Sequence, residues 1–143
     1  MHAGYATAHL TEIEPLSEPP PGEPQRRPLR HFLGISAFGT NVYFARADGD
    51  RVIDEHDELP GESAGEGGQQ ELYFVVSGHA TFTLGDEIVE APAGTFVFVR
   101  DPALMRGAVA RTAGAAVLTV GGWADRPFSP APWEQRAIQR TTA

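Results

Sequence analysis

The middle of the chain alternates hydrophobic and polar residues with the two-residue period of β-strands. The segment from Glu71 to Ser77 carries one tyrosine, one phenylalanine and two valines, which suit a pleated, buried surface, and it stops at a glycine. Three more short strands follow, separated by a turn at Gly85-Asp86 and by a Pro/Gly break at 91–94. They are Ala80 to Leu84, Ile88 to Glu90 and Thr95 to Val99. Four strands in this space predict an antiparallel sheet rather than βαβ units.

The strand pattern continues on both sides of this stretch. Upstream, Asn41 to Ala45 and Arg51 to Glu58 are joined by a turn at 48–50; downstream, Arg106 to Arg111 pairs with Ala115 to Val120. The total is about eight strands between Gly39 and Gly121, which is the number that a double-sheet jelly roll uses. The sequence therefore predicts an all-β, single-domain jelly-roll barrel.

Two of the predicted strands are apolar on both faces. In Tyr73 to Val76 and in Thr95 to Val99, hydrophobic residues occupy consecutive positions instead of every second one. One face of such a strand points into the barrel, and the other needs an apolar cover, either a second layer of sheet or a partner chain. We therefore expect a homodimer.

The two ends of the chain have a different composition. Residues 1–28 form a predicted N-terminal arm with six prolines, which permits neither a helix nor a ladder; the one ordered piece expected there is a short strand at His9 to Leu16. Leu29 to Ser36 is a helical turn or a first strand. The barrel spans 29–122, with a glycine-rich loop at 62–70, and the tail at 123–143 holds a short C-terminal helix at Trp133 to Arg140.

Composition limits the partners and the chemistry. The chain has 143 residues, a formal net charge of −8 and no cysteine. This net charge argues against nucleic acid or anionic membranes as partners, since both need basic patches on the protein, so neither is expected. Thiolate nucleophiles, thiolate metal sites and disulfides are excluded. No signal segment and no membrane span is evident, and we expect a cytoplasmic protein.

The region from about Thr40 to Gly122 resembles the cupin superfamily of small β-barrels. The first cupin motif ends in a Glu, six residues and a Gly, which Glu71 and Gly78 match. The second opens with a Gly and five residues before a Pro-x-Gly-x-x-His turn; here Gly94 and TFVFV precede Arg100 to Met105, so Met105 stands where the family has its ligand His. The resemblance implies a cupin-type barrel with an incomplete metal-binding motif.

Metal-binding cupins use a His-x-His pair, the Glu of the first motif and the His of the second, a ligand set suited to Fe, Mn, Ni or Zn. Without an insertion the His-x-His pair falls on Ala64 and Glu66; with the glycine-rich loop as an insertion it falls on His56 and Glu58. We prefer the second alignment, because residues two apart on a strand project to one face. The resemblance then implies a possible divalent-metal site at His56, Glu58 and Glu71.

A metal-free pocket is the other interpretation. A carboxylate that points into a small barrel is costly unless it is paired, and Arg106 is the natural partner of Glu71, with Arg100 as an alternative. The expected ligand-binding residues are Glu71, Arg106, Tyr73, His56 and Val97. A one-residue slip at Met105 would reverse which of Met105 and Arg106 faces inward.

Three functions follow from these interpretations. The first is binding of a small polar or anionic molecule in the barrel without the usual His-rich site, for which no cofactor is expected. The second is a metal-dependent enzyme of dioxygenase or isomerase type using His56, Glu58 and Glu71. The third is a structural or dimerisation module with a filled barrel.

Overall fold

The computed structural model describes residues 4–61 and 64–142 of the chain. The elements, in chain order, are η1 (Leu10–Glu12), β1 (Gln25–Arg27), α1 (Leu29–Leu33), β2 (Gly39–Phe44), β3 (Arg51–His56), β4 (Gln70–Ser77), β5 (His79–Leu84), β6 (Glu87–Pro92), β7 (Phe96–Val99), β8 (Arg106–Ala110), β9 (Ala116–Gly122) and α2 (Pro132–Thr142).

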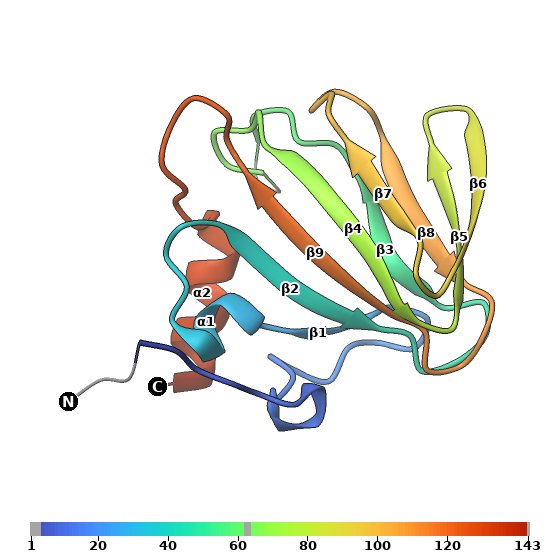
Figure 1. Cartoon of the computed structure of the whole chain (residues 1–143), viewed down its shortest axis with the longest axis horizontal. Helices are drawn as coiled ribbons and strands as arrows, with labels where there is room; N and C mark the ends of the chain where they lie inside the picture. The colour runs from blue at the N-terminus through green and yellow to red at the C-terminus, as the bar shows by residue number, and fades with distance from the viewer. Residues whose placement is uncertain (1–3, 62–63, 143) are drawn as a thin grey trace.

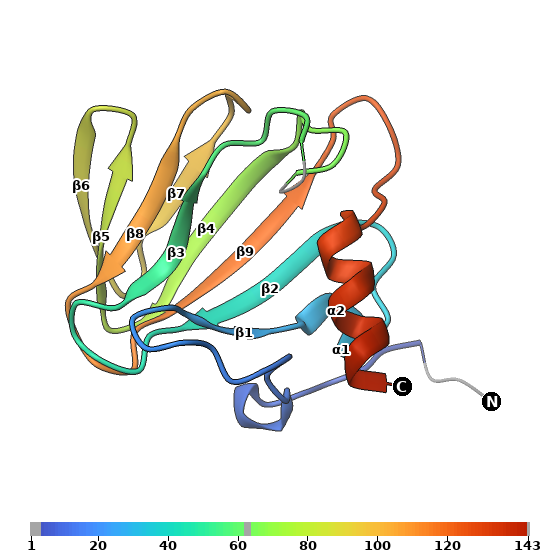
Figure 2. The ribbon, with the colours of Figure 1, turned by 180° about the vertical axis from the view of Figure 1, so that it is seen from behind.

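The strands form two antiparallel sheets. The five-stranded sheet has the order β1-β2-β9-β4-β7, and the four-stranded sheet has the order β3-β8-β5-β6. Figures 1 and 2 show both helices lying beside β1 and β2, away from β5 and β6. The predicted all-β jelly-roll architecture is confirmed, and all the strands predicted between Gly39 and Gly121 are present.

The hydrophobic core lies between the two sheets. Because side chains alternate across a strand, Tyr73 and Val75 on β4 and Val97 and Val99 on β7 share the inner face. They pack with residues of the other sheet, and the Tyr73 and Phe82 ring centroids lie 5.5 Å apart. The core therefore fixes the orientation of β4, the strand that carries Glu71.

The strand predicted at His9 to Leu16 is wrong. Residues 10–12 form the 3₁₀ helix η1, capped at His9, whose ring nitrogen accepts from the backbone N–H of Thr11 while the Glu12 carboxylate accepts from the backbone N–H of His9. This reciprocal capping satisfies the free N–H groups of the turn locally, so a helical turn forms instead of an extended strand.

The prediction that residues 1–28 form no ladder is also wrong. β1 pairs with β2 in the register Gln25↔Phe44, Arg26↔Tyr43 and Arg27↔Val42. The three residues of β1 lie between Pro24 and Pro28, so each keeps the backbone N–H that a ladder needs. The arm thus adds an edge strand to the larger sheet.

The segment from Leu29 to Ser36, left open between helix and strand, contains the short helix α1. The predicted C-terminal helix is present as α2. A 2.8 Å ion pair joins Arg30 Nε to Glu134 Oε1, and the Arg26 guanidinium lies 4.2 Å from the centre of the Trp133 ring. Two arginines near β1 therefore hold the tail helix against the barrel.

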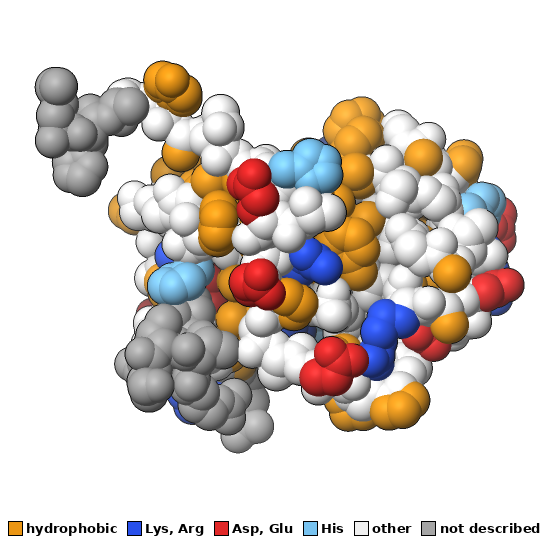
Figure 3. Space-filling view, turned by 90° about the horizontal axis from the view of Figure 1, so that it is seen from below, with side chains coloured by type: hydrophobic (Ala, Val, Ile, Leu, Met, Phe, Trp, Pro, Cys, Tyr) orange, Lys and Arg blue, Asp and Glu red, His pale blue; other side chains and the backbone are white. Residues whose placement is uncertain are grey.

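Charges are mixed over the surface. In the face shown in Figure 3, arginines stand among acidic and hydrophobic side chains, and the described residues visible on this face form no block of one sign. None of the helices within 4–61 and 64–142 is long and apolar enough to cross a membrane.

Gly78, the last residue of the first cupin-like motif, is expected to be the more sensitive of two turn glycines. Both Gly78 (φ 73°) and Gly94 (φ 94°) have positive φ, but a Cβ at Gly78 would lie 2.5 Å from Thr112 Oγ1 and 2.9 Å from Ala115 Cα, whereas a Cβ at Gly94 meets nothing within 4 Å. We expect Gly78→Ala to cost about 1–3 kcal/mol more than Gly94→Ala, because it adds a steric clash to the backbone strain. Urea unfolding of both variants measures the difference, and equal losses would contradict this assignment.

Candidate functional site

Five polar residues from three strands and one loop converge at one end of the barrel. His56 ends β3, and the β3–β8 register places it opposite Arg106. Glu71 and Tyr73 lie two residues apart on β4 and share a face. Glu58 follows β3 and is held by its backbone, whose N–H donates to the Pro102 carbonyl (2.8 Å) and whose carbonyl accepts from Gly68 N–H (2.6 Å). The site is therefore built on sheet positions and one anchored loop residue.

Glu71 is the centre of this cluster. Its Oε1 accepts hydrogen bonds from the Tyr73 hydroxyl (2.7 Å) and from Arg106 Nη1 (3.0 Å). The same oxygen lies 3.2 Å from His56 Nε2. One carboxylate oxygen thus collects a hydroxyl, a guanidinium and an imidazole, and such charge-assisted bonds are the strong ones in proteins.

Arg106 points inward and Met105 outward. The Arg106 side chain is 0% exposed, and Met105 is 45% exposed. Besides its bond to Glu71, Arg106 places Nη1 3.8 Å from Glu58 Oε1 and donates from Nη2 to the Asp101 carbonyl. A buried guanidinium is tolerated only where carboxylates compensate its charge, so Arg106 and the two glutamates depend on each other.

The protonation of His56 follows from its neighbours. Burial by itself lowers the pKa of His56, but its hydrogen bonds to Glu58 and Glu71 and the charge of Glu71 outweigh burial and raise the pKa to about 10. Nδ1 lies 2.7 Å from the Asp54 carbonyl and Nε2 lies 3.3 Å from Glu58 Oε1, so an imidazolium donates on both sides. His56 is a second cation beside Arg106.

The pKa values of the two glutamates are shifted in opposite directions. Burial is the largest influence on both, and it raises the pKa of Glu58, helped by the nearby charge of Glu71. For Glu71 the effect of burial is outweighed by the hydrogen bond and charge of His56 and by the Tyr73 hydroxyl, so its pKa is lowered. Burial also raises the pKa of Tyr73 well above its ordinary value. Glu71 is therefore the firmly ionised member, and Tyr73 remains a hydroxyl donor.

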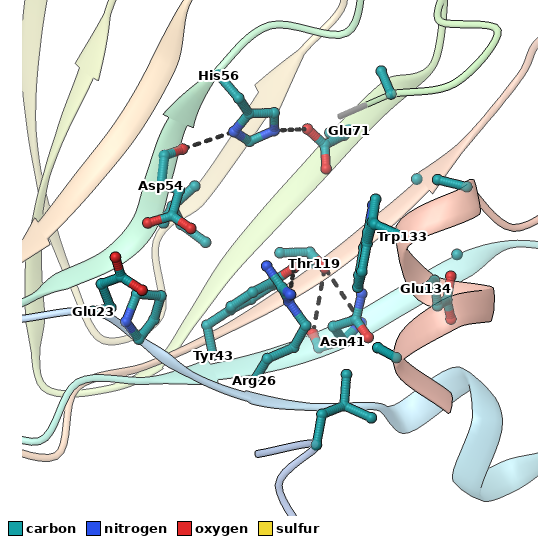
Figure 4. Close-up of a pocket in the computed structure, with 18 of the residues that line it drawn as sticks. Glu23, Arg26, Asn41, Tyr43, Asp54, His56, Glu71, Thr119, Trp133 and Glu134 are labelled. Carbon is teal, nitrogen blue, oxygen red and sulfur yellow. Dashed lines mark hydrogen bonds and ion pairs between the residues drawn. The ribbon is translucent and has the colours of Figure 1, made fainter. Parts of the chain in front are cut away.

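The cluster opens into a cavity of about 680 Å³ between the barrel, the N-terminal arm and α2. Figure 4 shows His56 and Glu71 apart from a second polar group made of Arg26, Tyr43, Asn41 and Trp133. That volume suits a small molecule. The cavity lining is rich in acids, which are Glu18, Glu23, Asp54, Glu55, Glu58, Glu71 and Glu134.

Four of the six predicted site residues line the cavity, and the other two lie behind its wall. His56, Glu58, Glu71 and Tyr73 line the cavity. Arg106 lies behind Glu71 and is absent from the lining, and Val97 belongs to the hydrophobic core instead of the cavity wall. The structure thus brings four of the six named residues to the cavity surface and one, Arg106, into direct contact with them.

Sequence reasoning missed the part of the cavity contributed by the two ends of the chain. Arg26 comes from β1, Asn41 and Tyr43 from β2, and Trp133 from α2. The one available signal was the pair Arg26-Arg27 between two prolines, the first arginines of the chain, which follow four glutamates in residues 12–23. It was overlooked because the arm was expected to lack a ladder.

The residues fit a metal only in part. Ligand atoms of His56, Glu58 and Glu71 all lie within 4.8 Å of one another, as a metal site requires. However, the Arg106 guanidinium is already bonded to Glu71, and His56 is the sole imidazole among these three groups. In this arrangement, the positive charge that a metal would supply comes from Arg106 and His56.

Comparison with known proteins gives the fold. No protein-family model and no curated protein matches the sequence. A solved, uncharacterised protein with a double-stranded β-helix domain from Klebsiella pneumoniae is 20% identical, with a TM-score of 0.63 over 89% of this chain and 97% of that one. A cupin protein from Bacteroides fragilis is 15% identical, with a TM-score of 0.60 over 91% and 93%. KdgF from Halomonas sp. is 18% identical, with a TM-score of 0.60 over 79% and 90%. The likeness is one of fold, and the chain has the double-stranded β-helix fold of the cupin proteins.

Proposed function

We propose that this cupin-fold protein binds a small polar molecule in its cavity without a metal, with Arg106 in the role of the cation. The observation that supports this most strongly is the fully buried guanidinium donating to Glu71 at 3.0 Å. A divalent ion at the same place would have to displace both Arg106 and the proton of His56. Each displacement costs free energy, because it breaks charge-assisted bonds in a partly buried site.

The polar groups that remain on the cavity wall suit hydroxyl groups of a ligand. The carboxylates of Glu58 and Glu71 accept hydrogen bonds from such hydroxyls, whereas both N–H groups of the His56 imidazolium are already bonded within the protein. The ligand would enter a site whose charges are already balanced, so a neutral polar portion is favoured at this end. The cavity also disfavours a purely structural module with a filled barrel, because open space of about 680 Å³ remains.

A metal-dependent activity is the second candidate. The convergence of His56, Glu58 and Glu71 within 4.8 Å supports it. His56 would then coordinate through Nε2 in its neutral form, since Nδ1 faces the Asp54 carbonyl. In the first candidate function, the Arg106 side chain keeps its bond to Glu71. In the second, it must move away from Glu71 to make room for the metal.

Metal analysis separates the two candidates. We expect purified wild-type protein to hold no stoichiometric Fe, Mn, Ni or Zn, and Arg106→His, which replaces the guanidinium by an imidazole, to gain affinity for Zn²⁺ or Mn²⁺. Isothermal titration with each metal measures both affinities. Stoichiometric metal that disappears in His56→Ala would instead establish the metal-dependent candidate.

Binding of small polyols tests the metal-free candidate. Chelator-treated wild type should still be stabilised by small polyols, by about 2.7 kcal/mol at a hundred times the dissociation constant, and Glu71→Gln should lose this effect.

The charge of His56 predicts a dependence of stability on pH. The pKa of about 10 in the folded protein exceeds the ordinary value of 6.5, so the folded state holds the proton more tightly. This stabilisation is complete below pH 6.5 and is lost as the pH rises to about 10. We expect the free energy of unfolding to fall by up to about 1.4 kcal/mol per pH unit within this window.

Urea unfolding at several pH values measures this slope. The window is favourable because all 11 basic residues are arginine, so no lysine titrates in it. His56→Asn should flatten the slope, and the matched control His31→Asn, on an exposed position of α1, should keep it. An unchanged slope in His56→Asn would show that the imidazolium is not paired as described.

We propose that the partner is a second copy of the chain, docked on the outer face of the larger sheet. The β4–β7 and β4–β9 registers align two apolar rows there, Phe96-Phe74-Leu118 and Phe98-Leu72-Val120. Phe96 is 66% exposed and Phe98 is 49% exposed. Apolar rows of this size are rare on monomers, and the same patch on two copies is self-complementary about a twofold axis, with the edge strand β7 at its border.

The oligomeric state tests this proposal. We expect Phe98→Glu to convert a dimer to a monomer, because it places a charge within the apolar patch. Sedimentation velocity measures the state. Ile88→Glu is the matched control, since Ile88 is also exposed but lies on β6 of the other sheet. A monomeric wild type would refute the proposal.

A further inference from the structure

The end of the cavity away from His56 and Glu71 contains a cation without an ion-pair partner. Arg26 donates from Nε to the Tyr43 hydroxyl at 3.2 Å, and its guanidinium lies 5.2 Å from the centre of the Tyr43 ring and 4.2 Å from that of Trp133. Its Nη1 and Nη2 make no hydrogen bond and no ion pair with any residue that the structure describes. The fork of the guanidinium is therefore available to a molecule in the cavity.

Asn41 provides an independent sign of a missing partner. The residue is 8% exposed and lines the same cavity, and its Oδ1 is buried without a hydrogen bond. A buried amide with an unpaired polar atom costs free energy unless a ligand or water satisfies it. Asn41 lies two residues from Tyr43 on β2, so their side chains share a face. Figure 4 shows both beside Arg26.

These groups have the chemistry of an oxyanion site. The free nitrogens of Arg26 present two parallel N–H groups, the geometry that matches a carboxylate. The Tyr43 hydroxyl accepts from Arg26 and keeps its own proton for donation, since burial raises the pKa of Tyr43 and holds it protonated. In the Asn41 amide, only the Nδ2–H groups can donate to a carboxylate, and the unpaired Oδ1 is an acceptor that calls for a donor such as a hydroxyl of the ligand.

The surrounding charges favour a monoanion over a dianion. Several acids of the cavity lining are neutralised by pairs, such as Glu134 with Arg30 and Glu18 with Arg46. Asp54 and Glu23 have no such pair among the described residues, and both line the cavity. A dianionic phosphate would meet stronger repulsion from them than a carboxylate does, because the energy grows with the product of the charges.

We propose that Arg26, Tyr43 and Asn41 form a carboxylate-binding subsite, so that the ligand of the cavity is a small monocarboxylate whose other end carries hydroxyl groups. The carboxylate contacts Arg26, and the hydroxyl end reaches Glu58 and Glu71. This inference rests on the proposed function, since it assumes that the same cavity binds a polar molecule, and it adds the chemical class of that molecule.

Acetate tests the subsite without knowledge of the natural ligand. In ¹⁵N spectra of the full chain, acetate should shift the Arg26 Nε–H and the Trp133 indole N–H signals, while acetamide and chloride at matched ionic strength should not. An Arg26 signal that does not respond to acetate overturns the proposal and leaves Arg26 as a residue that only holds α2 on the barrel.

Matched ligand pairs then test the orientation. Lactate and glycerate should bind at least about 10-fold more tightly than lactamide and glycerol, because hydrogen bonds to a charged partner are lost in the neutral compounds. Arg26→Gln should abolish this preference, because it removes the charge that distinguishes the acids from the neutral compounds. The control Arg111→Gln removes the same charge from an exposed position outside the cavity and should have no effect.

Two smaller substitutions keep the subsite testable if Arg26→Gln fails to fold. Tyr43→Phe removes the hydroxyl only, and Asn41→Asp keeps the shape but adds a negative charge; both should reduce the carboxylate preference while Trp133 still stacks on Arg26. Equal affinities for acid and neutral compounds overturn the subsite but leave the proposed function standing. If acetate shifts Arg26 but neither member of any pair is affected by Glu71→Gln, the proposed function fails and the subsite survives.

Discussion

The site depends on the bond between Arg106 and Glu71, a buried cation held by a nearly buried carboxylate. Either charge by itself would be costly in this environment, since desolvation of one ion is offset only by a close partner. The Tyr73 hydroxyl and His56 complete the arrangement by bonding the same carboxylate oxygen. The strand ends around the site are therefore held by this polar network as well as by the hydrophobic core beneath it.

This network changes what a cupin-type barrel can do. Where the resemblance implies a metal bound by imidazoles, this chain has one imidazole, two glutamates and a guanidinium that supplies positive charge. The charges are balanced within the protein, so the cavity wall offers hydrogen-bonding groups instead of an open coordination position. In the proposed function, these groups of the chain itself bind and orient a polar molecule.

The ends of the chain enlarge the barrel into a cavity. β1 extends the sheet, and α2 is held by Arg30 and by the stacking of Arg26 on Trp133. Without these segments, the polar mouth of the barrel would face solvent. The arm and the tail therefore line the cavity, although none of their described residues belongs to the core between the sheets.

The sequence by itself determined the strands, because alternation of side chains and the Glu71-to-Gly78 spacing are local properties, but it left the partner of Glu71 open between Arg106 and Arg100. It also placed His56 and Glu58 on one side of the glycine-rich loop, near Glu71. Only the tertiary structure decided that Arg106 faces inward and Met105 outward, because the face of each depends on the β3–β8 register. The contribution of Arg26, Asn41 and Trp133 was likewise undetermined, since residues from β1, β2 and α2 meet only after the chain closes on itself.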